Sequence, residues 1–99
     1  MENNAIDHQI DLITEAMKKA GLWSSETPYW IRNYKNGAPV NFWQWLQFIH
    51  LPMRSLGILH QPDYLGPQLR YFMNNDPDQQ KILQLVIELD AITSTWKRK

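Results

Sequence analysis

Apolar residues recur at intervals of three and four along three separate segments of this 99-residue chain. Side chains at that spacing share one face of an α-helix, so the pattern predicts amphipathic helices. The clearest segment covers residues 5–20, with apolar positions at Ile6, Ile10, Ile13, Met17 and Ala20. An asparagine at position 3 or 4 can cap its start, and Gly21 can supply the left-handed residue that ends it.

The second segment begins at residue 42 and contains a proline. Asn41 precedes it and Gln44 follows three residues later, which is the pattern of a capping box. Pro52 has no backbone N–H and should kink the helix. The apolar positions nevertheless keep their phase across the proline, so the sequence predicts a kinked but continuous helix to about His60.

The last long segment starts at Asp76-Pro77, where an aspartate can cap and a proline can occupy the first helical position. Its apolar face continues to about Trp96. A shorter helix is expected around residues 67–74. Because strand-type alternation is absent outside residues 22–40, the fold class is predicted to be all-α: a single domain, residues 1–99, built as a small bundle of three main helices and one or two short ones.

Residues 22–40 break the helical pattern. Pro28 and Pro39 punctuate the segment, and Asn36-Gly37 is a turn signal. Its aromatic content is too high for a solvated linker, so we expect an ordered, largely non-helical crossover that packs over the core. This crossover can contain one short helix around residues 29–34.

The three apolar faces must meet in one small core. The predicted central residues are Ile10, Ile13, Trp45, Leu46, Ile49, Val86 and Leu89.

Composition excludes several function classes. The chain has no cysteine, which removes disulfides, thiolate metal sites and thiol nucleophiles. Ten basic and ten acidic residues give a formal net charge of zero, which weakens the case for nucleic-acid or membrane binding. The four glycines are isolated, so no phosphate-binding loop is present. We therefore expect no enzyme activity, no cofactor and no metal.

No apolar stretch approaches the roughly 20 residues that a membrane span needs, and the polar first residues do not resemble a secretory signal. These features predict a cytoplasmic protein with no membrane association. The oligomeric state is open.

A group of acidic residues resembles a metal site. Asp7, His8, Asp11 and Glu15 recur at helical spacing and could share a cation. They lie opposite the apolar stripe of their helix, however, and the simpler interpretation is a solvated polar face.

The candidate binding residues form a stripe on the proline-containing helix, at spacings of four, three and four. An indole, an amide, an imidazole and a guanidinium on one narrow face could bind an anion or a base. The alternative is a boundary stripe in which the tryptophan covers the core and the polar groups make local hydrogen bonds. The four residues are Trp43, Gln47, His50 and Arg54.

Asp90 lies within the apolar arc of the last helix rather than on its polar stripe. A buried carboxylate needs hydrogen-bond donors, so we expect a structural role. The expected donors are a tryptophan N–H, Arg54 or an amide of the crossover. Such donors would favour the charged form and lower the pKa of Asp90.

Residues 42–53 resemble the central motif of the YqcC-like family, small bacterial proteins of unknown function. The motif is an aromatic residue, then Trp-Leu-Gln, then a proline; here these are Phe42, Trp45-Leu46-Gln47 and Pro52. Leu22-Trp23 and Glu88-Leu89-Asp90 are also similar. Family members usually follow the proline with arginine and an apolar residue, whereas this chain has Met53-Arg54. The resemblance implies a helical bundle. Some members are encoded beside a tRNA pseudouridine synthase, which implies, by association, an accessory role in RNA modification.

Three functions are compatible with these observations. The first is a non-catalytic interaction module that docks an unknown protein partner through exposed aromatic surface. The second is an accessory RNA- or nucleotide-binding protein linked to tRNA modification. The third is a small-ligand carrier with a pocket under the crossover. The absence of paired acid and base residues favours a non-enzymatic role.

Overall fold

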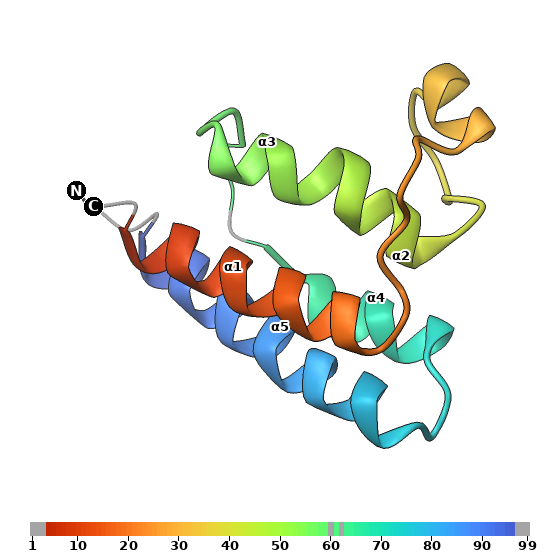
Figure 1. Ribbon diagram of the computed structural model, residues 1–99. Helices are drawn as coiled ribbons and strands as arrows, with labels where there is room; N and C mark the ends of the chain where they lie inside the picture. The colour runs from red at the N-terminus through yellow and green to blue at the C-terminus, as the bar shows by residue number, and fades with distance from the viewer. Residues whose placement is uncertain (1–3, 60, 62, 97–99) are drawn as a thin grey trace.

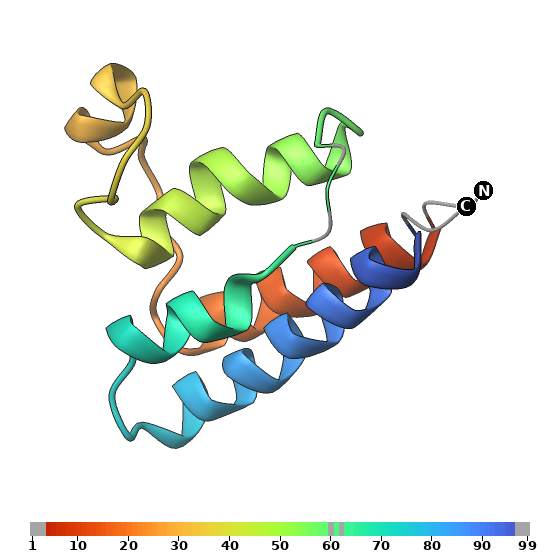
Figure 2. The same cartoon turned by 180° about the vertical axis from the view of Figure 1, so that it is seen from behind.

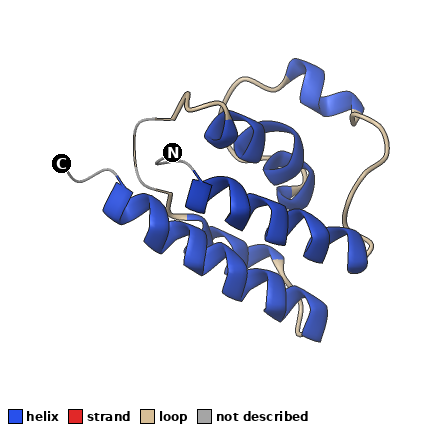
Figure 3. Cartoon of the chain, turned by 60° about the vertical axis from the view of Figure 1, so that its left-hand side comes forward, coloured by secondary structure: helices blue, strands red, loops and turns tan. Residues whose placement is uncertain are grey.

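The computed structural model describes residues 4–59, 61 and 63–96, and within them every regular element is a helix (Figure 3). Among these residues, five elements are α-helices, and two further segments are irregular helices. The 3₁₀ helix η1 lies in the crossover, and the π-helical segment η2 lies between α2 and α3. The elements are α1 (Asn4–Lys19), η1 (Tyr29–Asn33), α2 (Phe42–Trp45), η2 (Leu46–His50), α3 (Leu51–Ser55), α4 (Leu65–Phe72) and α5 (Pro77–Trp96).

The helix α5 is central to the arrangement. It runs antiparallel to α1 and packs against both α1 and α4 (Figures 1 and 2). The segments α2, η2 and α3 form one continuous rod, residues 42–55, which lies alongside α1 and contacts it. We call it the α2–α3 rod. The predicted all-α bundle is confirmed.

The two helix caps expected at the ends of the crossover, one closing α1 and one starting α2, are both present. Gly21 takes a φ of +75°, and the Leu22 amide donates to the Met17 carbonyl at 2.9 Å, which closes α1 with a left-handed turn. Asn41 Oδ1 accepts the Gln44 amide at 3.1 Å and so caps α2. The proposed N-cap at position 3 lies outside the described residues.

Pro52 changes the helix in a way the sequence did not indicate. In a regular α-helix its ring would press on the carbonyl of Phe48, four residues earlier. The chain instead widens into the π-helical segment η2, where the Leu51 amide donates to the Leu46 carbonyl five residues back. The rod stays continuous across the proline, as the apolar phase predicted.

The predicted end of this helix near His60 was wrong. The rod ends at Ser55, and Gly57, with a φ of +76°, reverses the chain. The Ile58 amide then donates to the Met53 carbonyl at 3.1 Å, which is the same closing bond that ends α1. His60 itself lies outside the described residues.

The core confirms four of the seven predicted central residues: Ile13, Leu46, Val86 and Leu89 are all fully buried. Ile10 and Trp45 pack against the core only from its edge, and Ile49 is partly buried. A helical stripe buries only its middle fully, and these three residues lie toward its margins. The remaining core residues are Ile6, Met17, Phe42, Trp43, Leu51, Leu65, Leu69, Ile82 and Leu83.

Candidate binding site

The structure turns most of the predicted binding stripe inward. Trp43, Gln47 and Arg54 are all buried, with 8%, 7% and 4% of their surface exposed, while the His50 side chain is 12% exposed. Such a stripe cannot present four groups to solvent together. The alternative interpretation, a boundary stripe with local hydrogen bonds, describes Trp43 and Gln47 better.

Gln47 fixes the crossover to the rod. Its side-chain amide accepts the Ser24 amide proton at 2.8 Å and donates to the Ser24 carbonyl at 2.9 Å. A second glutamine of the rod, Gln44, accepts the Trp30 indole N–H at 2.8 Å. These contacts order the crossover, as its aromatic content predicted, and they commit Gln47 to a structural role.

His50 and Arg54 instead meet Asp63, which lies just before α4. The Arg54 guanidinium donates to Asp63 Oδ1 and to the carbonyl of Gln61. His50 Nε2 lies 3.0 Å from the same carboxylate oxygen. We call His50, Arg54 and Asp63 the charge cluster. It joins the end of the rod to the start of α4.

The charge cluster keeps Asp63 ionised. Burial by itself would raise the pKa of this carboxyl, but the neighbouring His50 and Arg54 groups outweigh burial and hold the pKa below its ordinary value. The second carboxylate oxygen, Oδ2, is buried and accepts no hydrogen bond from the described residues.

Asp63 is also held through its backbone. Its amide donates to Thr93 Oγ1 at 2.8 Å, and the Thr93 hydroxyl donates to the Asp90 carbonyl one turn earlier in α5, at 3.1 Å. Thr93 is fully buried. The segment that carries the charge cluster is therefore fixed from both the rod and α5.

Asp90 has the structural role that its position predicted, but with different donors. Its two carboxylate oxygens accept the backbone amides of Leu65 and Gly66 at 2.9 and 2.8 Å, so α5 caps the first turn of α4. A Cβ on Gly66 would come within 3.1 Å of Ile87 Cγ1 and 3.2 Å of Asp90 Oδ2, so a larger residue there would require these side chains to shift. Neither Arg54 nor the crossover provides the donor.

The expected lowering of the Asp90 pKa was wrong. Desolvation by burial raises the pKa, and it outweighs the two amide hydrogen bonds that act in the opposite direction. The nearby negative charge of Asp63 adds to the increase. The two neutral backbone amides at Asp90 compensate for less of the cost of burying a charge than His50 and Arg54 do at Asp63.

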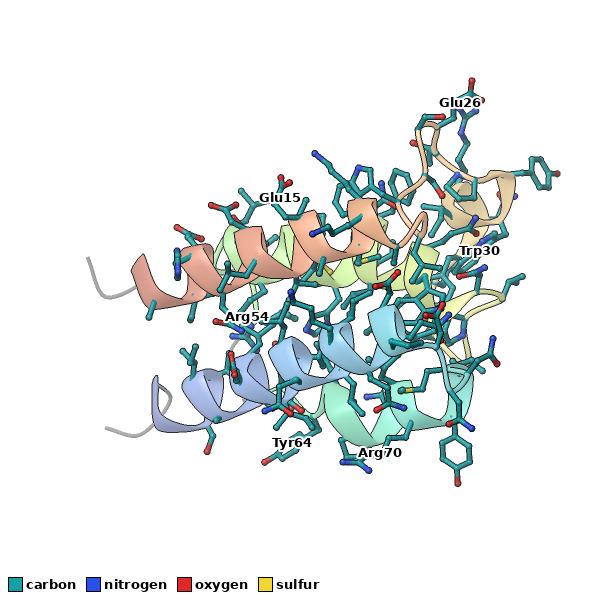
Figure 4. All side chains as sticks on the ribbon, turned by 60° about the horizontal axis from the view of Figure 1, so that its bottom comes forward. Glu15, Glu26, Trp30, Arg54, Tyr64 and Arg70 are labelled. Carbon is teal, nitrogen blue, oxygen red and sulfur yellow. The ribbon has the colours of Figure 1, made fainter. Side chains whose placement is uncertain are left out.

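An open hollow of about 560 Å³ lies beside the charge cluster, between the rod and the start of α4. We call it the α3–α4 hollow. Ile58 and Tyr64, which are 51% and 68% exposed, belong to its lining. Figure 4 shows Tyr64 pointing outward from the bundle and Arg54 lying between the helices. The complete lining is Trp45, His50, Met53, Arg54, Ile58, Leu59, Gln61, Asp63, Tyr64, Leu65 and Gln68.

Two of the four predicted residues, His50 and Arg54, thus border one hollow, while Trp43 and Gln47 do not. The residue that organises the site, Asp63, was not among the predicted site residues. Its one sequence signal is a carboxylate shortly before an apolar helix. Thr93 could have been found from its helical phase, which matches that of Val86 and Leu89.

The candidate metal-binding residues of α1 form the solvated face that was expected. Asp7, His8, Asp11 and Glu15 are all exposed, and the described part of the chain contains no cluster of three metal-ligating side chains. None of the described helices is long and apolar enough to span a membrane.

Comparison with known proteins adds no assignment. No protein-family model, no curated protein and no solved structure matches this chain.

Proposed function

We propose that this chain is a non-catalytic protein-interaction module whose α3–α4 hollow receives an apolar segment of a partner protein. One observation carries the proposal: Ile58 and Tyr64 remain largely exposed beside a preformed hollow. Single exposed apolar side chains are common on protein surfaces, but apolar groups gathered around a concavity are typical of docking sites.

The chemistry of the hollow supports recognition rather than catalysis. Asp63 is engaged by Arg54 and His50, and Arg54 also holds the Gln61 carbonyl. The charged groups are therefore occupied with one another, and the largely exposed side chains Ile58 and Tyr64 offer apolar contact area. An aromatic side chain with a polar tip, such as Tyr64, contributes strongly at protein interfaces.

A small-ligand carrier is the second candidate. The hollow measures about 560 Å³, and ligand pockets commonly span roughly 300–1,000 Å³. Met53 and Trp45 supply further apolar lining. The same site would then hold a compact apolar molecule instead of a peptide segment.

We also propose membership of the YqcC-like family on the basis of its central motif. The motif residues have definite structural roles here: Leu46 is in the core, Gln47 binds the crossover, and Pro52 follows the π-helical segment. The described residues offer no support for the tRNA link that the resemblance implies.

Photo-crosslinking inside cells tests the interaction proposal. A photoreactive phenylalanine analogue replaces Tyr64 in one variant and Tyr29, 83% exposed on the crossover, in the control. The proposal predicts a discrete protein adduct from position 64 that is absent from position 29 and lost when Ile58→Glu is added. RNA adducts, or equal adducts from both positions, would contradict it.

The carrier alternative needs a different measurement. Native mass spectrometry of the protein purified from cells would show a bound small molecule as a constant added mass. That added mass, together with failure of the crosslink, would favour the carrier over the interaction module.

A further inference from the structure

A second concave surface lies on the α1–α5 pair, on lining residues different from those of the α3–α4 hollow. It is an open groove of about 550 Å³. Figure 4 views α1 and α5 with the α2–α3 rod behind them, and Glu15 projects from α1 at the edge of this pair. The groove is lined by Leu12, Glu15, Ala16, Lys18, Lys19, Asp78, Lys81 and Leu85.

The floor of the groove is apolar. Leu12 is 38% exposed, although the core-facing residues of the same helix are almost fully buried. Ala16 and Leu85 beside it are half-buried and pack on the edge of the core. A strip of apolar surface thus runs between two helices and has no third helix over it among the described residues.

The borders of the groove carry excess positive charge. Three lysines and two carboxylates line it, a net charge of +1 in a chain whose formal net charge is zero. Lys18 lies 4.0 Å from Glu15 and over the Trp23 ring. Lys19 on α1 and Lys81 on α5 form no ion pair with a described residue, so both walls carry a lysine that can meet an acidic partner.

We propose that the α1–α5 groove docks an acidic amphipathic helix of a partner protein. The two walls are α-helices whose backbone groups are already bonded along each helix. The groove therefore offers no backbone edge to an extended peptide, and an occupant must satisfy its own backbone, as a helix does. A ridge of leucine side chains on the partner helix would cover Leu12 and Leu85, and carboxylates beside that ridge would meet Lys19 and Lys81.

A second copy of the chain is a poorer occupant. A twofold axis through the groove would place two linings, each with a net charge of +1, against one another. The acidic residues Asp7 and Asp11 lie on the exposed side of α1, whose apolar side is buried in the core of its own chain. Among the described residues, therefore, no free helix combines an apolar ridge with acidic borders.

The test uses two synthetic helices of about 18 residues, long enough for appreciable helix formation in water. Both carry one leucine stripe, flanked by glutamates in one peptide and by lysines in the other. The protein variant Lys19→Glu/Lys81→Glu is compared with Arg32→Glu/Lys35→Glu, which reverses two exposed charges on the crossover. Fluorescence anisotropy gives the affinities, and NMR locates the binding.

The proposal predicts that the acidic peptide binds and shifts the signals of Leu12 and Leu85. The groove variant should weaken this binding by about tenfold, whereas the crossover variant should leave it unchanged. The groove variant should also gain affinity for the basic peptide.

Three results would overturn the proposal. Equal binding of the two peptides, or shifts away from Leu12 and Leu85, would exclude charge-selective docking in this groove. Binding of decanoate without binding of either peptide would assign the groove to small anionic amphiphiles. Self-association that Leu12→Glu abolishes would assign it to a second copy. None of these results bears on the α3–α4 hollow.

Discussion

Arg54 of the rod and Asp63 before α4 form an ion pair that is almost completely buried, with 2% and 1% of their side chains exposed. Removing one partner of a buried pair leaves an uncompensated charge in the interior. We therefore expect Arg54→Met or Asp63→Asn to lower the free energy of unfolding by about 3–5 kcal/mol.

The double variant provides the control for that prediction. With both charges removed, the loss should be well below the sum of the two single losses, because neither charge remains unpaired. Urea unfolding of all four proteins measures the coupling. Additive losses would mean that the two side chains act independently.

The acid sensitivity of the fold should depend on Asp63. Its pKa is lowered in the folded state, so the stability contributed by its ionised form is present above the ordinary value of 3.8. That contribution is lost as the pH falls through the lowered pKa. Stability curves between pH 7 and pH 2 should be flatter at their acidic end for Asp63→Asn than for the unmodified chain.

Asp90 should behave in the opposite way. Its pKa is raised on folding. The stability that its protonated form contributes is therefore fully present below pH 3.8 and is lost as the pH rises through the raised pKa. Carboxyl NMR titration should give Asp90 a midpoint above 3.8. A midpoint below that value would mean that the two amide hydrogen bonds outweigh burial.

The cap that Asp90 provides has its own consequence for stability. Asp90→Ala removes the acceptor of two backbone amides at the start of α4, and a loss of about 1–3 kcal/mol is expected. Asp90→Asn retains one acceptor and should lose less, because burial opposes the charge that Asp90 brings to this site. Equal losses for the two variants, measured by urea unfolding, would contradict this account.

Gln47 should control the order of the crossover near Ser24. Gln47→Leu keeps a similar volume but removes both hydrogen bonds to the Ser24 backbone. Hydrogen exchange of the Ser24 amide should become faster, whereas the Tyr34 amide, which donates to Ile31 within the crossover, should be unaffected. Unchanged exchange at Ser24 would remove Gln47 from this role.

Much of the fold follows from local patterns. The apolar stripes of α1 and α5 are local features of the sequence. Helix capping is also local, because each capping residue acts within a turn or two of its own position; these residues are Gly21, Asn41 and Asp76. Asp76, for example, accepts the Asp78 amide at 3.0 Å, as expected for the start of α5. The end of the rod was predicted less well because apolar phase continued past Gly57, where the backbone reverses.

The candidate site was only half predictable for a physical reason. The spacing of His50 and Arg54 placed them on one face, but whether that face meets solvent depends on Asp63, nine residues beyond Arg54 in the irregular segment before α4. A carboxylate in an irregular segment carries no periodic signal. The Asp90 pKa likewise depends on a balance between burial and hydrogen bonding that helical phase does not contain.

The most direct test of the docking proposal is the affinity of the partner identified by the Tyr64 crosslink. Binding should be compared for the unmodified chain, Ile58→Glu and Val40→Glu; Val40 is exposed on the crossover side of the molecule, away from the lining of the hollow. The account predicts that Ile58→Glu raises the Kd by about tenfold or more, since a carboxylate replaces an apolar contact, and that Val40→Glu leaves it unchanged. Equal Kd values for the two variants would contradict docking in the α3–α4 hollow.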